Sequence, residues 1–150
     1  MSVSHFMKAY FYVSEPTQPF DPCSLEALVN SAMVKNAAYN ITGFLCYQDV
    51  FIQYFEGDCK AVDALFDVLK KDPRHTILNY ITFEDIDHRQ FPTWRMKLIG
   101  RNALNQDCVE PLLYNKLARA SGAVLEPANW RKQVWLAIEH IASQPGTTVG

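Results

Sequence analysis

The spacing of hydrophobic residues predicts five strands and two helices over the first hundred residues. Strand-like runs, rich in aromatic and β-branched residues, occupy residues 6–13, 41–47, 50–55, 76–83 and 94–99. Helical spacing predicts one helix from about Ser24 and a second that opens at residues 57–58 and ends at residues 72–73. The order β-α-β-β-α-β-β is the ferredoxin-like pattern with one more strand. We therefore expect an α+β fold in which both helices cover one face of a mixed sheet.

The last third of the chain has a different pattern, without strand-like runs. Helical spacing predicts two further helices at residues 106–120 and 127–143, separated by Ser121 and Gly122. This change predicts a first domain over residues 1–102 and a two-helix C-terminal extension over residues 103–150, with a frayed end.

Composition and charge narrow the class of protein. Hydrophobic residues make up 49% of the chain and charged residues 20%, which is typical of a globular protein. The net charge is -2 and there is no basic stripe, so we expect no nucleic-acid partner. No apolar stretch approaches the ~18 residues of a membrane span, and the N-terminus lacks the pattern of a signal peptide. We expect a soluble, cytoplasmic protein that binds no membrane.

The sequence motifs of common enzymes and metal proteins are missing. The four cysteines are widely spaced, which predicts reduced and mostly buried thiols. They are Cys23, Cys46, Cys59 and Cys108. The histidines do not pair at metal-ligand spacings, and no G-x-G-x-x-G, P-loop or G-x-S-x-G motif occurs. We therefore expect neither a metal site nor enzymatic activity.

Two amide side chains lie on faces that are otherwise apolar. Strand alternation places Gln53 between Phe51 and Phe55, where a buried amide needs hydrogen-bond partners. Asn36 follows Ala32 by four residues and so shares the apolar face of the first helix. A core glutamine bonded to backbone and an asparagine that caps the helix end are the alternatives for these two positions.

Aromatic and sulfur-containing side chains add to this set. Tyr12 shares a strand face with Phe6 and Tyr10, and Trp94 and Met96 are expected on one face of the fifth strand. A core tyrosine with a bonded hydroxyl, and ordinary core packing, would account for them as well. All these groups lie on elements that could converge under the two helices.

Four segments together resemble the BLUF domain, a family of blue-light sensors using FAD. They are residues 40–47 (NITGFLCY), 51–57 (FIQYFEG), 72–75 (DPRH) and 94–96 (WRM). Their order and spacing agree with the family pattern from residue 6 to residue 99, and the two-helix tail resembles that of stand-alone members without an output enzyme. The resemblance implies a blue-light photoreceptor that binds FAD non-covalently.

The resemblance also implies roles for individual residues. Tyr12 would give an electron, and then a proton through Gln53, to the excited flavin, and Gln53 would bridge this tyrosine and the flavin N5/C4=O edge. Asn36 would bond the C4=O and N3–H edge, with Arg74 and His75 near the cofactor. An apolar slot would hold the flavin ring between Leu28, Ala32, Leu65 and Leu69. The signal would pass outward through Trp94 and Met96 to a partner protein of unknown identity.

Two positions depart from the family pattern and leave the cofactor open. Lys35 stands beside the asparagine where relatives often have an uncharged or histidine side chain, and Val68 replaces a residue that is basic in some members. FMN is therefore possible in place of FAD. The alternatives are a ferredoxin-like interaction module without a functional flavin and a small flavin-dependent enzyme. An exposed sheet face, Trp130 and Trp135 predict a homo-oligomer.

Overall fold

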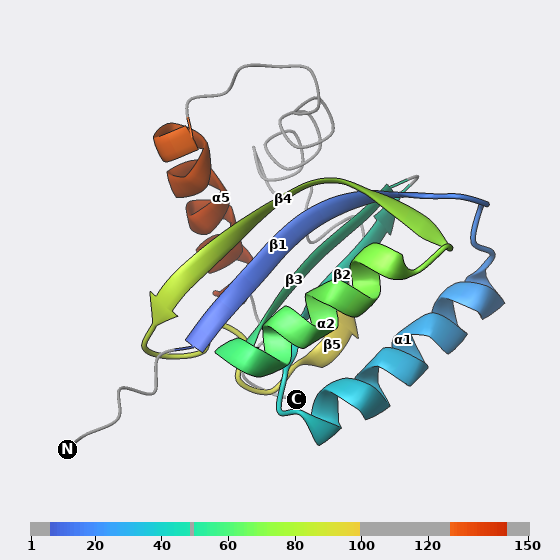
Figure 1. Ribbon diagram of the computed structural model, residues 1–150, viewed down its shortest axis with the longest axis horizontal. Coiled ribbons are helices and arrows are strands. Elements are labelled where there is room, and N and C mark those ends of the chain that lie inside the picture. The colour runs from blue at the N-terminus through green and yellow to red at the C-terminus, as the bar shows by residue number, and fades with distance from the viewer. Residues whose placement is uncertain (1–6, 49, 100–126, 144–150) are drawn as a thin grey trace.

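A five-stranded mixed sheet organises the chain (Figure 1). The computed structural model describes residues 7–48, 50–99 and 127–143. The strands are β1 (Met7–Pro16), β2 (Thr42–Gln48), β3 (Val50–Asp58), β4 (His75–Ile86) and β5 (Arg95–Leu98). Their order in the sheet is β4-β1-β3-β2-β5, with β5 parallel to β2 and the other pairs antiparallel.

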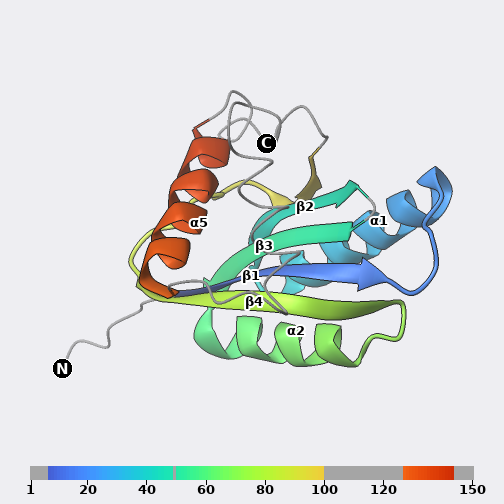
Figure 2. The ribbon, with the colours of Figure 1, turned by 90° about the horizontal axis from the view of Figure 1, so that it is seen from above.

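The helices divide between the two faces of this sheet. α1 (Pro22–Ala38) and α2 (Cys59–Lys71) lie together on one face, and α5 (Pro127–Ala142) lies on the other (Figure 2). The predicted α+β architecture with two helices on one face is confirmed, as is the helix predicted at 127–143. The helix predicted at 106–120 lies outside the described residues.

Acidic caps begin both helices on the first face. The side chain of Asp21 accepts a hydrogen bond from the Ser24 backbone N–H at 2.7 Å, and Asp58 does the same for Lys60 at 3.1 Å. α1 begins two residues before the predicted start at about Ser24, because Asp21 caps the helix and Pro22 fits its first turn, where no N–H is needed.

Alternation along β1 separates two hydrophobic cores. Ala9, Phe11 and Val13 pack toward α5, whereas Tyr10 and Tyr12 pack toward α1 and α2. On the α5 side, Trp135 lies against Phe83, with ring centroids 4.8 Å apart. α5 therefore covers part of the sheet face that we expected to be exposed (Figure 2).

The cysteine prediction holds in part. Cys23, Cys46 and Cys59 are thiols and not disulfides, but only Cys46 of these three is buried. The prediction of mostly buried thiols is wrong for Cys23 and Cys59, because they stand in the first turns of α1 and α2 at positions that face solvent. Cys108 lies outside the described residues.

A bulge at β5 overturns the prediction that Trp94 and Met96 share a face. Gly43 pairs with Arg95 but the next residue of β2 pairs with Lys97, so Met96 is an extra residue with φ 94°. Trp94 precedes the strand and belongs to the core on the α5 side, whereas Met96 is fully buried on the side of α1 and α2. The extra residue breaks the period of two on which the prediction depended.

Candidate functional site

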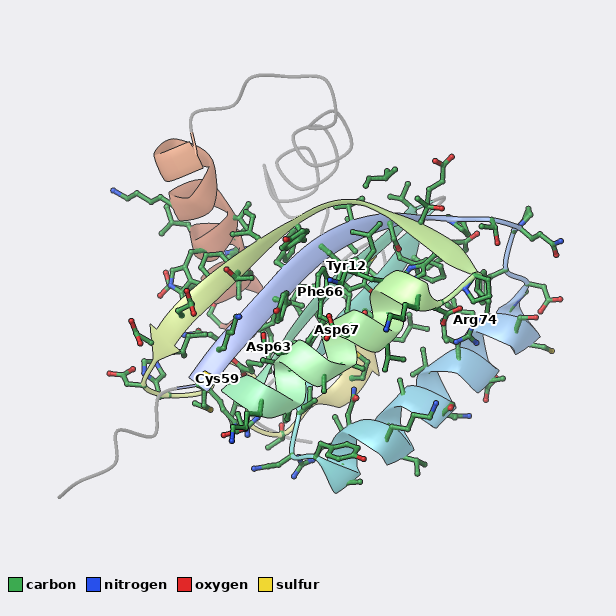
Figure 3. The ribbon with its side chains drawn as sticks, in the orientation of Figure 1. Tyr12, Cys59, Asp63, Phe66, Asp67 and Arg74 are labelled. Atoms are coloured by element: carbon green, nitrogen blue, oxygen red, sulfur yellow. The ribbon has the colours of Figure 1, made fainter. Side chains whose placement is uncertain are left out.

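A hollow under α1 and α2 brings together most of the residues singled out from the sequence. Two of them, Tyr12 on the sheet and Arg74 after α2, are labelled in Figure 3. The sheet supplies its floor, and the two helices and the segments next to them supply its walls. Its lining comprises Tyr12, Phe20, Leu28, Ala32, Leu45, Phe51, Gln53, Leu69, Asp72, Arg74, His75 and Met96. A wider hollow of about 600 Å³ adjoins it near the start of α1 and shares Phe20, Leu28 and Arg74.

A hydrogen-bonded chain of three side chains forms the floor. Tyr12 and Gln53 are register partners on β1 and β3, and the Tyr12 hydroxyl donates to Gln53 Oε1. Gln53 Nε2 donates to Met96 Sδ, 3.1 Å away. The bulge in β5 is what turns the Met96 thioether toward Gln53. All three side chains are buried, so the network is shielded from water.

Burial fixes the protonation state of Tyr12. It raises the pKa of the phenol well above its ordinary value of 10.0, and the negative charge of Asp72 adds to the shift. Tyr12 is therefore a neutral phenol at physiological pH, and its O–H is the donor to Gln53.

Arg74 and His75 are anchored at the end of α2. The Leu69 carbonyl accepts from His75 Nε2 at 2.7 Å, which requires the proton on that nitrogen, and Nδ1 lies 2.7 Å from the Ser14 hydroxyl. The Arg74 guanidinium pairs with Asp72, with Nη2 and Oδ2 2.6 Å apart, and this hydrogen bond lowers the pKa of Asp72.

A third hollow, of about 420 Å³, opens between α1 and α2 at their other ends. It is lined by residues of both helices, including Lys35, Asn36, Leu65 and Val68. Leu65 thus lies apart from the hollow that holds Leu28, Ala32 and Leu69. Lys35 is exposed, and Val68 is 63% exposed, so the two positions that depart from the family pattern face solvent at one mouth of the cleft.

Asn36 is the one described side chain with a buried polar atom that has no hydrogen-bond partner. It is 3% exposed, and its Nδ2 has no partner among the described residues. A buried unpaired amide costs roughly 1–3 kcal/mol. The cap alternative for Asn36 applies only to its main chain, whose carbonyl accepts from Tyr39 and Ile41. The side chain is available to a ligand.

The set of donors and apolar walls fits a flavin, which is a flat ring system with a polar edge. The Gln53 amide has two N–H donors and gives one to Met96, so among the described contacts the second is available, like Asn36 Nδ2. Leucine and alanine side chains of α1 and α2 supply apolar walls on either side.

Sequence reasoning missed Asp72 and Phe20 as site residues. Asp72 marked only the end of a helix, yet it orients Arg74 and faces the Tyr12 environment. Phe20 lies in a proline-rich loop, and its ring meets Phe51 edge-on at 5.1 Å. Only the polar segment at residues 72–75 carried a signal for Asp72, and no pattern marked Phe20.

The described part of the chain has neither a candidate metal site nor a helix that could span a membrane. Across residues 7–48, 50–99 and 127–143, no group of three His, Cys, Asp or Glu side chains could hold a metal ion. None of the helices described there is long and apolar enough to cross a membrane.

Comparison with known proteins finds similar sequences and folds. The BLUF family, described as sensors of blue-light using FAD, matches residues 7–97. The photoactivated adenylate cyclase subunit beta of Euglena longa is 34% identical over 82 residues, and the chain spans 10% of that protein's length. The match takes in 54% of this chain.

Two solved structures extend the similarity to the fold. The dark-state structure of BlrB, a BLUF protein, is 26% identical, with a TM-score of 0.69 over 94% of this chain and 98% of that one. The structure of Klebsiella pneumoniae BlrP1 with FMN and cyclic diGMP is also 26% identical, with a TM-score of 0.59 over 91% of this chain and 35% of that one.

Proposed function

The chain belongs to the BLUF family, sensors of blue-light using FAD, and from this premise we propose that Tyr12 and Gln53 convert absorbed light into a rearranged hydrogen-bond network. A BLUF domain is a sensor module that binds a flavin, and not an enzyme. The observation that carries the proposal is the buried chain of hydrogen bonds from Tyr12 through Gln53 to Met96, on the floor of the cleft.

The walls and floor of the cleft would hold the flavin. Leu28, Ala32, Leu65 and Leu69 would pack on the faces of its ring. Asn36 Nδ2 and Gln53 would bond its polar edge, with His75 and Arg74 at one end of the cleft and Lys35 at the other. We propose FAD as the cofactor, supported by the family and by the wide hollow next to the site, and FMN, which BlrP1 holds, as the alternative.

The bound flavin would supply light absorption and, once excited, a strong one-electron oxidant. Tyr12 gives up an electron and then its proton along the hydrogen bond to Gln53, because a phenol is oxidisable and its proton is already directed to an acceptor. Gln53 carries a donor and an acceptor on one amide. Its rotation or tautomerisation therefore exchanges the donor and the acceptor that face Tyr12 and Met96. The altered pattern persists after Tyr12 recovers its electron and proton.

Met96 gives the rearranged network a way out of the cleft. It bonds Gln53 and stands at the bulge of edge strand β5, two residues after Trp94, which packs on the opposite face of the sheet. A change at Gln53 therefore biases an irregular strand that reaches both cores. We propose that residues 103–150 form the extension that reads this change for a separate partner protein, and that residues 1–102 form the sensor. The family match, which ends at residue 97, supports this division.

We also propose a homo-oligomer that works in the cytoplasm. Large apolar side chains are exposed on α1 and α5, with Val34 at 73% and Leu136 at 54%, and such positions favour association when they gather. The described cysteines are thiols and not disulfides, as is usual in a reducing compartment.

Visible absorption spectroscopy tests the proposed photochemistry. The purified protein should be yellow, shift its flavin spectrum to the red under blue light and recover in the dark. Tyr12→Phe and Gln53→Leu should each abolish the shift and retain the flavin, because the first lacks the proton and the second the amide. Tyr80→Phe, at a half-exposed position outside the hollow, is the control and should shift normally.

Two results would contradict the proposal. A colourless protein that takes up no added flavin would favour the interaction module without a cofactor. A normal red shift in either Tyr12→Phe or Gln53→Leu would show that the two residues do not carry the photochemistry.

A further inference from the structure

A second tyrosine of β1 has a stronger proton acceptor than Tyr12 has. The Tyr10 hydroxyl donates to Asp63 Oδ1 at 2.5 Å, and Lys8 Nζ lies 2.8 Å from the same oxygen. Burial, followed by the bond to Asp63, raises the pKa of Tyr10 to about 12, although Lys8 opposes the shift. Figure 3 shows Asp63 and Phe66 on α2, the helix that covers this strand. The phenol of Tyr10 is thus held against a carboxylate.

Packed aromatic rings connect Tyr10 with Tyr12. The two tyrosines are two residues apart on one face of β1, which spaces their Cα atoms by roughly 7 Å. Phe66 stacks on Tyr10 with centroids 4.3 Å apart and lies 6.2 Å from the Tyr12 ring. The Phe66 ring thus joins the two oxidisable tyrosines through packed side chains, so an electron has a short path from Tyr10 to Tyr12.

The surroundings favour an oxidised Tyr10 over an oxidised Tyr12. Tyr12 is 2% exposed and donates to a neutral amide, so a positive charge left on it stays buried. Tyr10 donates to a carboxylate, which accepts a proton far more readily than an amide oxygen. The Asp63 side chain is also 48% exposed, so the charge that reaches it is hydrated.

Lys8 opposes this transfer without preventing it. Burial raises the pKa of Asp63, but the hydrogen bonds from Lys8 and Tyr10 outweigh burial and lower it overall. The ammonium also lies 5.0 Å above the Tyr10 ring, where it disfavours a positive ring. A Tyr10 that loses its electron and proton together stays uncharged, so the Lys8 ammonium above the ring no longer opposes its oxidation. The proton of an oxidised phenol is also far more acidic than that of the phenol.

We propose that Tyr10 is a second electron donor that re-reduces oxidised Tyr12 and passes its own proton to Asp63. One electron moves from Tyr10 to Tyr12, the Tyr10 O–H bond breaks, and an O–H bond forms on Asp63 Oδ1. Tyr12 keeps its phenolic proton, or regains it along the bond from Gln53. The products are intact Tyr12, a neutral Tyr10 radical and protonated Asp63. The electron first given by Tyr12 later returns to Tyr10, with the proton from Asp63.

This transfer rests on the proposed function, because Tyr12 must first be oxidised. It also competes with the rearrangement of Gln53 that produces the signal. Once Tyr10 is the oxidised residue, Tyr12 has regained its electron from Tyr10. It has therefore not taken part in the recombination with the flavin that rearranges Gln53. Tyr10 thus lowers the yield of signalling and lengthens the life of the separated charge. Tyr10→Phe is expected to raise the quantum yield of the red shift.

Electron paramagnetic resonance on the full chain loaded with FAD tests the assignment. The protein is illuminated with blue light at cryogenic temperature, and the tyrosyl signals are separated by their hyperfine pattern and decay. Wild type should show a slowly decaying component that is lost in Tyr10→Phe, which keeps the stacked ring, and in Asp63→Asn, which lacks the proton acceptor. Tyr80→Phe is the matched control, because Tyr80 also lies beside Phe66, at 4.8 Å, and the component should persist there.

The variants separate failure of the second donor from failure of the proposed function. Loss of every tyrosyl signal in Tyr12→Phe supports the order Tyr12 before Tyr10. A wild-type spectrum and decay that are unchanged in Tyr10→Phe, with the signal still lost in Tyr12→Phe, overturn only the role of Tyr10. A signal that survives Tyr12→Phe overturns both. A readout without flavin is the pKa of Tyr10, followed by NMR of labelled tyrosine. It should be lower in Asp63→Asn than in wild type, and equal values in the two proteins would show that the bond is absent.

Discussion

At the scale of single residues, the buried carboxylate of Glu56 ties the loop before β5 to the sheet. Glu56 accepts from the backbone N–H groups of Gln90 at 3.0 Å and Phe91 at 2.7 Å, and from the Tyr54 hydroxyl at 2.8 Å. Arg89 closes the same corner by donating to Thr42 Oγ1 at 2.8 Å. The carboxylate therefore stands between the strand that carries Gln53 and the segment that leads to Met96.

Replacement of Glu56 should alter stability in a pH-dependent way. Burial raises the pKa of Glu56 above its ordinary 4.5, although hydrogen bonds to Gln90, Phe91 and Tyr54 offset part of the shift. The folded protein then holds a proton that the unfolded chain has lost, so this contribution is complete below pH 4.5 and declines as pH rises through the folded pKa. Glu56→Gln removes this decline.

Urea unfolding at acidic and neutral pH measures the effect. Glu56→Gln should lower the free energy of unfolding by roughly 1–3 kcal/mol, because its NH2 group meets a backbone N–H where Glu56 offers an acceptor. The difference from wild type should be smaller at neutral pH. Glu84→Gln, at an exposed position, is the control. A difference that grows as pH rises would show that Glu56 has a lowered pKa.

At the scale of elements, the close approach of β2 to β3 explains why residue 43 is glycine. A Cβ at Gly43 would lie 1.9 Å from the backbone oxygen of Tyr54, closer than any real contact. The Gly43 N–H also donates to the Trp94 carbonyl at 2.8 Å, next to the bulge. Gly57, in contrast, leaves 3.2 Å to its nearest neighbour.

Gly43→Ala should therefore disrupt the sheet at the bulge. We expect a loss of about 3 kcal/mol or more in the free energy of unfolding, since the obstacle is backbone and cannot turn aside. Gly57→Ala should cost clearly less and serves as the matched control. Chemical unfolding of both variants checks the comparison, and equal losses would mean that β2 and β3 separate easily.

The strands of this sheet also show where sequence patterns stop being informative. The faces of β1 and β3 could be predicted, because strict alternation put Tyr12 and Gln53 on apolar faces. Their hydrogen bond joins residues 41 apart in the chain, so it depends on a strand register that periodicity does not specify. Trp94 and Met96 fit an alternating pattern equally well, and only the pairing partners of β5 reveal the extra residue.

At the scale of the whole molecule, two cores share one sheet. The core under α1 and α2 contains the candidate site, and the core under α5 contains Trp94 and the β1 residues Ala9, Phe11 and Val13. Because each strand contributes alternate residues to both, a shift of a strand is felt on both faces. This coupling is what a sensor needs if light is absorbed on one face and read on the other.

The α5 side chains should consequently support the stability of the entire domain. Ile138 is fully buried against the sheet, so Ile138→Ala should cost about 2–5 kcal/mol. Leu136 is 54% exposed, and Leu136→Ala should change the free energy of unfolding by less than about 0.5 kcal/mol. Urea unfolding of the flavin-loaded chain can be followed both by circular dichroism and by flavin absorption. Coincident, lowered transitions in Ile138→Ala are expected, because one sheet forms the wall of both cores. A flavin transition that stayed at the wild-type midpoint would show α5 to be an independent appendage, and the sensor would then need another route to its far face.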